Sequence, residues 1–300
     1  MREEVMQRRD LLKYAAVAAA ATVLPGGAAP SRASQTNAKL RKALQFGMLP
    51  KSLSDAEKLK LAKKCGFEGI ELNSPIADLN AAAQLGKLAK EAGVSVHSIV
   101  YGGWDAPLSD PDPKKIEKGL AGMETALRSA KAVGADAVLL VPAVLNEDVG
   151  YGQAWERSQK NIRKLLPLAE ELKIIIAVEN VWNKFLLSPL EFARYVDEFD
   201  NPWLKAYIDV GNMILFGYAQ DWIRTVGKRI VKIHLKDFKR PSGRKGYEWT
   251  NLLDGDVNWK QVRLALGEVG YNGFLTPELG GGDEAYLTDL SQRIDKIIAM

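Results

Sequence analysis

Ionisable residues that interrupt apolar segments have the clearest chemical content in this sequence. Glu179 stands in "IIAVEN", Asp209 in "AYIDVG", His234 in "VKIHLK" and Glu278 in "LTPEL". An ionisable group in such a segment costs free energy unless a partner offsets its lost hydration. Each residue alone has an ordinary explanation as a helix cap or a hydrogen-bonded core residue. Three carboxylates gathered at one place, however, would repel one another without a cation.

The combination of three carboxylates and one imidazole predicts a metal site. This ligand set is hard and rich in oxygen, and it suits near-octahedral coordination better than tetrahedral zinc. We therefore predict one divalent ion, Mn²⁺ in the first place with Mg²⁺ and Co²⁺ as alternatives. Its predicted ligands are Glu179, Asp209, His234 and Glu278.

Four protein ligands would leave two coordination positions for a substrate. Two adjacent oxygens of a hydroxy-ketone sugar would fill both, and the ion would polarise the carbonyl and acidify the neighbouring C–H bond. One carboxylate beside that carbon can remove the proton, and a second can return one. Glu179 and Glu278 are the predicted catalytic acid/base pair.

These residues belong to a regular alternation of short apolar runs and longer segments of helical period. The runs are too apolar to be half exposed, as expected of parallel strands that are covered on both faces. The eight expected strands are residues 44–49, 69–73, 94–100, 136–143, 174–180, 205–212, 230–237 and 273–279.

Helical segments separate the expected strands. They start at polar residues such as Ser54 and Asp78 and end at glycines such as Gly66 and Gly93, which is the usual chemistry of helix caps. Eight strand–helix units over about 260 residues predict an α/β fold, a single (β/α)8 TIM barrel. A doubly wound open sheet is the alternative, but no glycine-rich phosphate loop follows any of the strands.

The predicted barrel explains why these ionisable residues would meet. Active sites of TIM barrels lie at the C-terminal ends of the strands, and the four predicted ligands stand near the ends of the expected fifth to eighth strands. One connection at that end is long: residues 238–259 separate the seventh strand from the next helix. We interpret this segment as a candidate lid, with a solvated surface insertion as the alternative.

Further polar and aromatic residues near strand ends are candidate substrate contacts. Trp182 can stack on a pyranose face, Asn212 can hydrogen-bond a hydroxyl, and Lys236 follows His234 just before the long connection. Glu71 and His97 end the second and third expected strands. The alternative for His97 is a core histidine.

The first residues have the layout of an export signal. The charged "QRRDLLK" (residues 7–13) precedes the uncharged "YAAVAAAATVL" (residues 14–24) and a segment of small residues. An apolar helix of this length spans about 16 Å of a bilayer core of about 30 Å, so we expect no permanent membrane span. The arginine pair resembles a twin-arginine signal, which implies the twin-arginine export machinery as a partner and a periplasmic or cell-envelope location. We divide the chain into signal peptide and linker (1–36) and barrel (37–300).

Composition limits the other classes of function. The 300 residues are 47% hydrophobic and 26% charged, as expected of a globular chain with one large domain or two small ones. The net charge of +4 is modest, and no basic run contains interleaved aromatic residues, so we expect no nucleic-acid partner. The single cysteine, Cys65, cannot form an intrachain disulfide. A small carbohydrate is the expected partner, and formation of a homo-oligomer stays open.

The ordered motifs "VEN", "IDVGN", "KIHLKD", "LLDGDVNW" and "GYNGFLTPEL" resemble those of the sugar phosphate isomerase/epimerase family, in the xylose isomerase-like TIM barrel superfamily. The resemblance covers nearly the whole chain after the signal. It implies that Glu179, Asp209, His234 and Glu278 bind the metal and that Arg240 contacts the substrate. The implied function is a divalent-metal-dependent isomerase or epimerase that acts on a keto sugar or sugar derivative through an enediolate, with the two glutamates as acid and base.

Two positions depart from the pattern of the ketohexose 3-epimerases in this group. Asn212 stands where they have a histidine, and Phe185, where an apolar surface is expected, replaces a second glutamate. These changes make a free ketohexose less expected as the substrate than another keto sugar. The alternative function is a metal-dependent lyase or hydratase on 3-keto-glycosides, by the same enolisation followed by β-elimination.

Two further classes are less favoured. A DNA-repair endonuclease with this barrel needs more histidines than the two in this chain. A non-catalytic sugar-binding barrel has no need of the intact pair Glu179 and Glu278.

Overall fold

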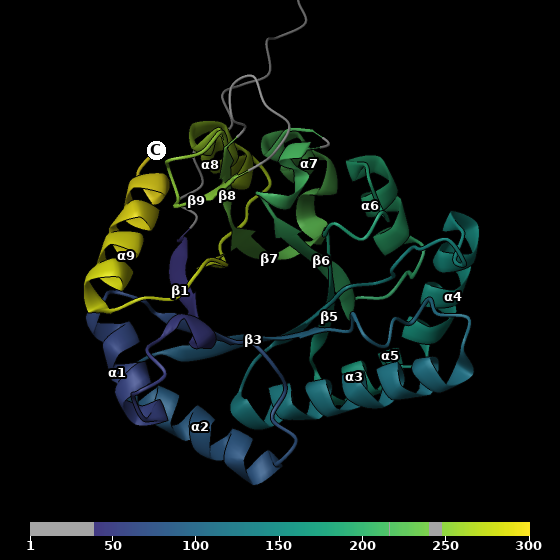
Figure 1. Ribbon diagram of the computed structural model, residues 1–300, viewed down its shortest axis with the longest axis horizontal. Coiled ribbons are helices and arrows are strands. Elements are labelled where there is room, and N and C mark those ends of the chain that lie inside the picture. Colours follow the sequence, from purple (N-terminus) through teal and green to yellow (C-terminus); the bar gives the residue numbers. More distant parts are fainter. Residues whose placement is uncertain (1–38, 216, 240–247) are drawn as a thin grey trace, which may run out of the picture. The chain divides into compact units, whose positions relative to one another are not determined.

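The computed structural model describes residues 39–215, 217–239 and 248–300. Within them, eight parallel strands close into a barrel in the order β1-β10-β7-β6-β5-β4-β3-β2, and helices surround the strands (Figure 1). The predicted (β/α)8 TIM barrel is confirmed. The barrel strands are β1 (Arg41–Gln45), β2 (Gly69–Leu72), β3 (Ser95–Gly102), β4 (Ala137–Leu140), β5 (Ile175–Glu179), β6 (Leu204–Asp209), β7 (Ile230–Leu235) and β10 (Phe274–Pro277).

Each expected strand is present, and the first differs most from its apolar run. β1 begins at Arg41, and the expected continuation of the strand is instead the 3-10 turn η2 (Phe46–Met48). Two basic residues are tolerated in β1 because each has a partner. The Arg41 guanidinium lies 3.9 Å from the centre of the Phe274 ring, and Lys42 Nζ lies 2.7 Å from Asp295 Oδ2.

The helices begin and end at the caps that the sequence predicts. Ser54 and Glu57 form a capping box at the first turn of α1, and Asp78 accepts two backbone hydrogen bonds at the start of α2. Gly93 ends α2 with a left-handed φ of 75°, which glycine adopts without steric cost. The α-helices are α1 (Asp55–Lys64), α2 (Leu79–Ala92), α3 (Pro113–Val133), α4 (Tyr151–Arg163), α5 (Leu166–Leu172), α6 (Pro189–Asp197), α7 (Ala219–Val226), α8 (Trp259–Glu268) and α9 (Glu284–Ile298); two further 3-10 turns are η3 (Asn212–Leu215) and η4 (Gly227–Arg229).

The long connection after β7 forms a second, small sheet. β8 (Asp237–Lys239) pairs with β9 (Glu248–Thr250) in antiparallel register, with Phe238 opposite Trp249. The first part of the candidate lid therefore contains two paired antiparallel strands. Arg240, the predicted substrate contact, lies outside the described residues.

The carboxylate of Asp237 accepts hydrogen bonds from the part of this connection that leads into α8. The buried Asp237 accepts hydrogen bonds from four backbone N–H groups between Phe238 and Val257, at 2.8–3.2 Å, and from Trp259 Nε1 at 2.9 Å. A Cβ atom at Gly255 would collide with the same carboxylate. The motif "LLDGDVNW" is thus the partner segment of the aspartate in "KIHLKD".

We expect Asp237→Asn to lower the free energy of unfolding by roughly 2–4 kcal/mol, because an amide cannot accept all five hydrogen bonds and leaves buried donors unpaired. Urea denaturation monitored by circular dichroism measures the change. The matched control is Asp254→Asn, which removes an exposed ion pair with Arg293 of 3.0 Å and should cost less than about 1 kcal/mol. Equal losses in both variants would contradict the role of Asp237.

In the described part of the chain, no helix has both the length and the apolar character needed to span a membrane. The predicted signal falls within residues 1–38, which lie outside that part. The boundary between residues 36 and 37 stays a prediction.

Candidate metal centre

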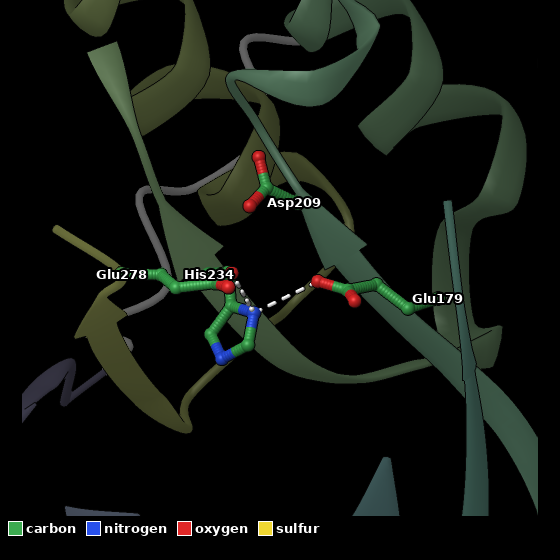
Figure 2. A group of neighbouring side chains, drawn as sticks. All are labelled: Glu179, Asp209, His234 and Glu278. Atoms are coloured by element: carbon green, nitrogen blue, oxygen red, sulfur yellow. Dashed lines mark hydrogen bonds and ion pairs between the residues drawn. The ribbon is translucent and has the colours of Figure 1, made fainter. Parts of the chain in front are cut away.

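The four predicted metal ligands lie together at the C-terminal ends of neighbouring strands (Figure 2). Glu179 ends β5, Asp209 ends β6, His234 lies one residue before the end of β7, and Glu278 directly follows β10. The strand register places Asp209 beside His234. One ligand atom from each side chain lies within 4.8 Å of those of the other three.

The distances within this cluster fit a divalent ion. His234 Nδ1 lies 2.8 Å from Glu179 Oε1 and 3.0 Å from Glu278 Oε2. Ligands on opposite sides of an ion with bonds of about 2.1 Å are about 4.2 Å apart. Small side-chain adjustments would therefore be enough for the four ligand atoms to coordinate one ion.

Two buried carboxylate oxygens in the cluster have no hydrogen-bond donor among the described residues: Asp209 Oδ2 and Glu278 Oε2. Lys236 Nζ lies 3.1 and 2.8 Å from them, which is ion-pair distance without good hydrogen-bond geometry. The other oxygen of Asp209 accepts from the backbone N–H groups of Gly211 and Asn212, each at 2.8 Å. Buried oxygens that lack a hydrogen bond can take a further electropositive partner, and the residues present fit the predicted ion.

The surroundings of the cluster shift the pKa values of its two glutamates in opposite directions. Burial raises the pKa of Glu179 to about 7 and also raises the pKa of Asp209. Burial acts in the same sense on Glu278, but His234 and Lys236 outweigh it and bring its pKa down to about 2. Burial would lower the pKa of His234, yet the surrounding carboxylates hold it well above its ordinary value.

A further carboxylate, that of Glu71, contacts the ring nitrogen of His234 that faces away from the cluster. Glu71 Oε1 lies 2.6 Å from His234 Nε2, and Tyr207 Oη donates to Glu71 Oε2 at 2.6 Å. Ser98 Oγ donates to the same oxygen, and Gln45 Nε2 donates to Oε1 at 3.0 Å. All five side chains are buried. Because Nε2–H points at a carboxylate, the ring turns Nδ1 toward the cluster, as in metal sites whose histidine is oriented by a second residue.

A cavity of about 290 Å³ adjoins the cluster, and Glu179, His234 and Glu278 are among its lining residues. Of the predicted substrate contacts, Trp182, Asn212 and Lys236 also line it. Asn212 Oδ1 accepts from Lys236 Nζ at 3.4 Å, and the Trp182 indole donates to the Asn212 carbonyl at 2.8 Å. These three residues are within reach of a bound molecule.

Two other predicted substrate contacts are not among the residues that line this cavity. Glu71 is fully buried and contacts His234 instead. His97 is buried in the barrel interior, where its ring stacks on Phe274 at 4.5 Å and its Nε2 lies 3.1 Å from Thr276 Oγ1. The reason is strand length: β3 runs on past His97 to Gly102. His97 therefore has the surroundings of a core histidine.

Phe185 also lies away from the cavity. Its side chain is buried and packs against Tyr151, Trp155 and Tyr195, with ring centres 5.1, 5.9 and 5.5 Å away. The expectation of an apolar pocket surface at this position is therefore wrong. The segment after β5 turns its phenylalanine into the layer of helices.

Sequence reasoning missed Trp104 as a lining residue. It follows the end of β3 in "YGGWD", so the rule that barrel sites form on the loops after strands would have found it. Trp249, which lies within the long connection, lines the same cavity.

The fold and the cluster define a class: a (β/α)8 barrel with three carboxylates and a histidine at its C-terminal face. The chain belongs to the xylose isomerase-like TIM barrel family, whose model matches residues 59–296. Residues 5–25 match the model of the twin-arginine translocation pathway signal sequence. Both the resemblance to this superfamily and the resemblance of the first residues to a twin-arginine signal are confirmed.

Individual relatives agree with this assignment. L-ribulose-5-phosphate 3-epimerase UlaE of Salmonella paratyphi A is 26% identical over 253 residues, which are 78% of this chain and 86% of the relative. Among solved structures, an L-ribulose 3-epimerase has a TM-score of 0.74 at 16% identity and covers 87% of this chain and 95% of its own. The 3-keto-D-glucoside 4-epimerase YcjR of E. coli has a TM-score of 0.72 at 17% identity, over 87% of this chain and 99% of its own.

Proposed function

We propose that this protein is a divalent-metal-dependent sugar isomerase or epimerase that acts on a keto sugar or sugar derivative through an enediolate. The observation that carries the proposal is the cluster of the buried Glu179, Asp209 and His234 with the partly exposed Glu278 beside a cavity. A curated relative that is named as a 3-epimerase supports the same reaction class.

In this proposal the four cluster residues hold the ion, and Mn²⁺ is the expected metal because the donors are mainly carboxylate oxygens. The ion, when bound, supplies Lewis acidity that polarises the substrate ketone and stabilises the negative charge on its oxygen. Lys236 and Asn212 face the same cavity and are proposed to bind substrate hydroxyls. Arg240 is a further proposed contact.

Glu179 and Glu278 are proposed to move the proton. They approach His234 Nδ1 from different sides (Figure 2), because β5 and β10 are three places apart in the barrel. One glutamate removes the proton from the carbon beside the ketone, and the electron pair of the C–H bond enters the enediolate. The other glutamate delivers a proton to the opposite face of that carbon, which inverts its configuration.

The proposed location is the periplasm or cell envelope. The signal-sequence match at residues 5–25 supports export by the twin-arginine machinery, a route that carries folded proteins. The division of the chain into signal peptide and linker (1–36) and barrel (37–300) is part of this proposal.

The reaction type is tested by incubating the purified, Mn²⁺-loaded protein with free ketoses and with a 3-keto-glycoside. We expect a C-3 epimer, detected by NMR, and no release of the aglycone. The replacement of histidine by Asn212 is the observation behind the alternative, a lyase or hydratase on 3-keto-glycosides. Rapid aglycone release without an epimer would replace the proposed epimerase by that lyase.

A further inference from the structure

Three exposed tryptophans line the cavity beside the metal centre. Trp104, Trp182 and Trp249 are 50%, 42% and 45% exposed and all belong to the lining. A single exposed aromatic residue is ordinary, but several around one cavity mark a binding surface. Indole rings offer flat apolar faces against which sugar or aryl rings stack.

Two of these rings form a fixed pair. Trp182 and Trp249 stack with centres 5.2 Å apart and an angle of 24° between their planes. Both pack edgewise against the buried Phe238, at 5.7 and 4.8 Å, and the Trp182 indole donates to the Asn212 carbonyl. The pair is therefore held in place before any ligand binds, which lowers the entropy cost of binding.

Trp104 lies on the other side of the barrel mouth. It follows β3, whereas Trp249 belongs to the hairpin that follows β7. In the barrel order, β3 and β7 are four places apart in a ring of eight strands, which is the opposite side. A ring that enters this mouth thus meets aromatic faces from two directions.

The charge of the described lining favours a neutral partner for these rings. Lys236 is the one lysine or arginine of the described lining, and Lys236 Nζ already lies within 3.1 Å of Asp209 and 2.8 Å of Glu278. The tryptophans are about half exposed, while Glu179 and His234 are 5% and 1% exposed and the side chain of Glu278, at 35%, lies between these limits. The site thus has a deep polar end and an outer aromatic end.

From this arrangement we infer that Trp104, Trp182 and Trp249 form a second subsite, which binds a ring linked glycosidically to the sugar that reacts at the metal centre. The substrate is accordingly a two-ring keto sugar, either a disaccharide or a glycoside. The inference rests on the proposed function, because the reacting sugar is assigned to the metal cluster.

Calorimetric titration of the Mn²⁺-loaded full chain compares D-fructose with isomaltulose, which carries a glucosyl ring on the sixth carbon of the same ketose. We expect isomaltulose to bind roughly three- to tenfold more tightly, the factor that one or two ring contacts supply. Trp104→Ala and Trp249→Ala should each remove most of this advantage and leave the affinity for D-fructose within about twofold. Tyr218→Ala is the matched control, because Tyr218 is 72% exposed and does not line the cavity.

Equal affinity for the two sugars, binding of neither, or an advantage that survives both tryptophan substitutions would overturn the subsite. Mn²⁺ titration of the same samples reports on the metal centre separately. A chain that binds Mn²⁺ and converts a free ketose but does not favour isomaltulose would lose the subsite and keep the proposed function. Thermal melting of each variant checks that the barrel is intact.

Discussion

Glu179→Gln and Glu278→Gln are each expected to lower kcat by roughly 10³-fold or more while the fold survives, because the acid/base step alone contributes roughly 10²–10⁴-fold and each change also removes a charged ligand. Both side chains lie within 3.0 Å of His234 Nδ1. Glutamine has nearly the same volume as glutamate, so it preserves the packing but cannot exchange a proton. Initial rates of ketose epimerisation, with thermal melting of each variant, measure the effect.

The matched control for this experiment is Glu268→Gln on α8. Glu268 forms a surface ion pair with Arg224 and is not among the residues that line the cavity. Its substitution should leave kcat within about twofold because exposed ion pairs contribute little. Full activity in either cluster variant would remove that glutamate from the proposed acid/base pair. Loss of folding in the variants but not in the control would assign the glutamates a structural role instead.

Glu71→Gln is expected to weaken Mn²⁺ binding by roughly 10–100-fold, as measured for residues that orient metal-binding histidines elsewhere. Glu71 lies 2.6 Å from His234 Nε2 and accepts from Tyr207 and Ser98. Burial raises the pKa of Glu71, but the charge of His234 outweighs this and the net shift is downward. The carboxylate is therefore ionised, and glutamine would place an amide where four donors converge.

Isothermal titration of the metal-free protein with Mn²⁺ gives the affinity directly, without a substrate. Ser98→Ala is the graded control: it removes one donor to Glu71 and leaves the contact with His234, so its effect should be severalfold smaller. A Kd for Mn²⁺ within twofold of the unaltered protein in Glu71→Gln, at an unchanged melting temperature, would show that Glu71 is only part of the core.

The parts of the site that follow from strand position were predictable from the sequence. Glu179, Asp209 and Glu278 interrupt apolar runs close to their ends, and parallel strands in a closed barrel bring such ends to one face. His234 joined them because it stands at the same end of the next strand in the series. Alternation of strands and capped helices was enough for the fold.

The sequence did not show whether a residue near a strand end faces the cavity or lies deeper, in the barrel interior. Glu71 and His97 look like strand-end residues in the sequence, but strand lengths and register place both in the barrel interior. Glu71 became informative only through its contact with His234, a residue 163 positions away. Phe185 and the hairpin with Trp249 likewise depend on which way a connection turns, and no periodic pattern marks that direction.

The central claim is that the cluster of Glu179, Asp209, His234 and Glu278 holds a divalent ion that is needed for removal of a proton beside a ketone. The most direct measurement is NMR of deuterium uptake at C-3 of ketoses, including isomaltulose, in D₂O. We predict uptake with the Mn²⁺-loaded protein, loss of uptake after metal removal by a chelator, and recovery on adding Mn²⁺. Uptake that persists without metal, or its absence from a protein that has bound Mn²⁺, would contradict the account.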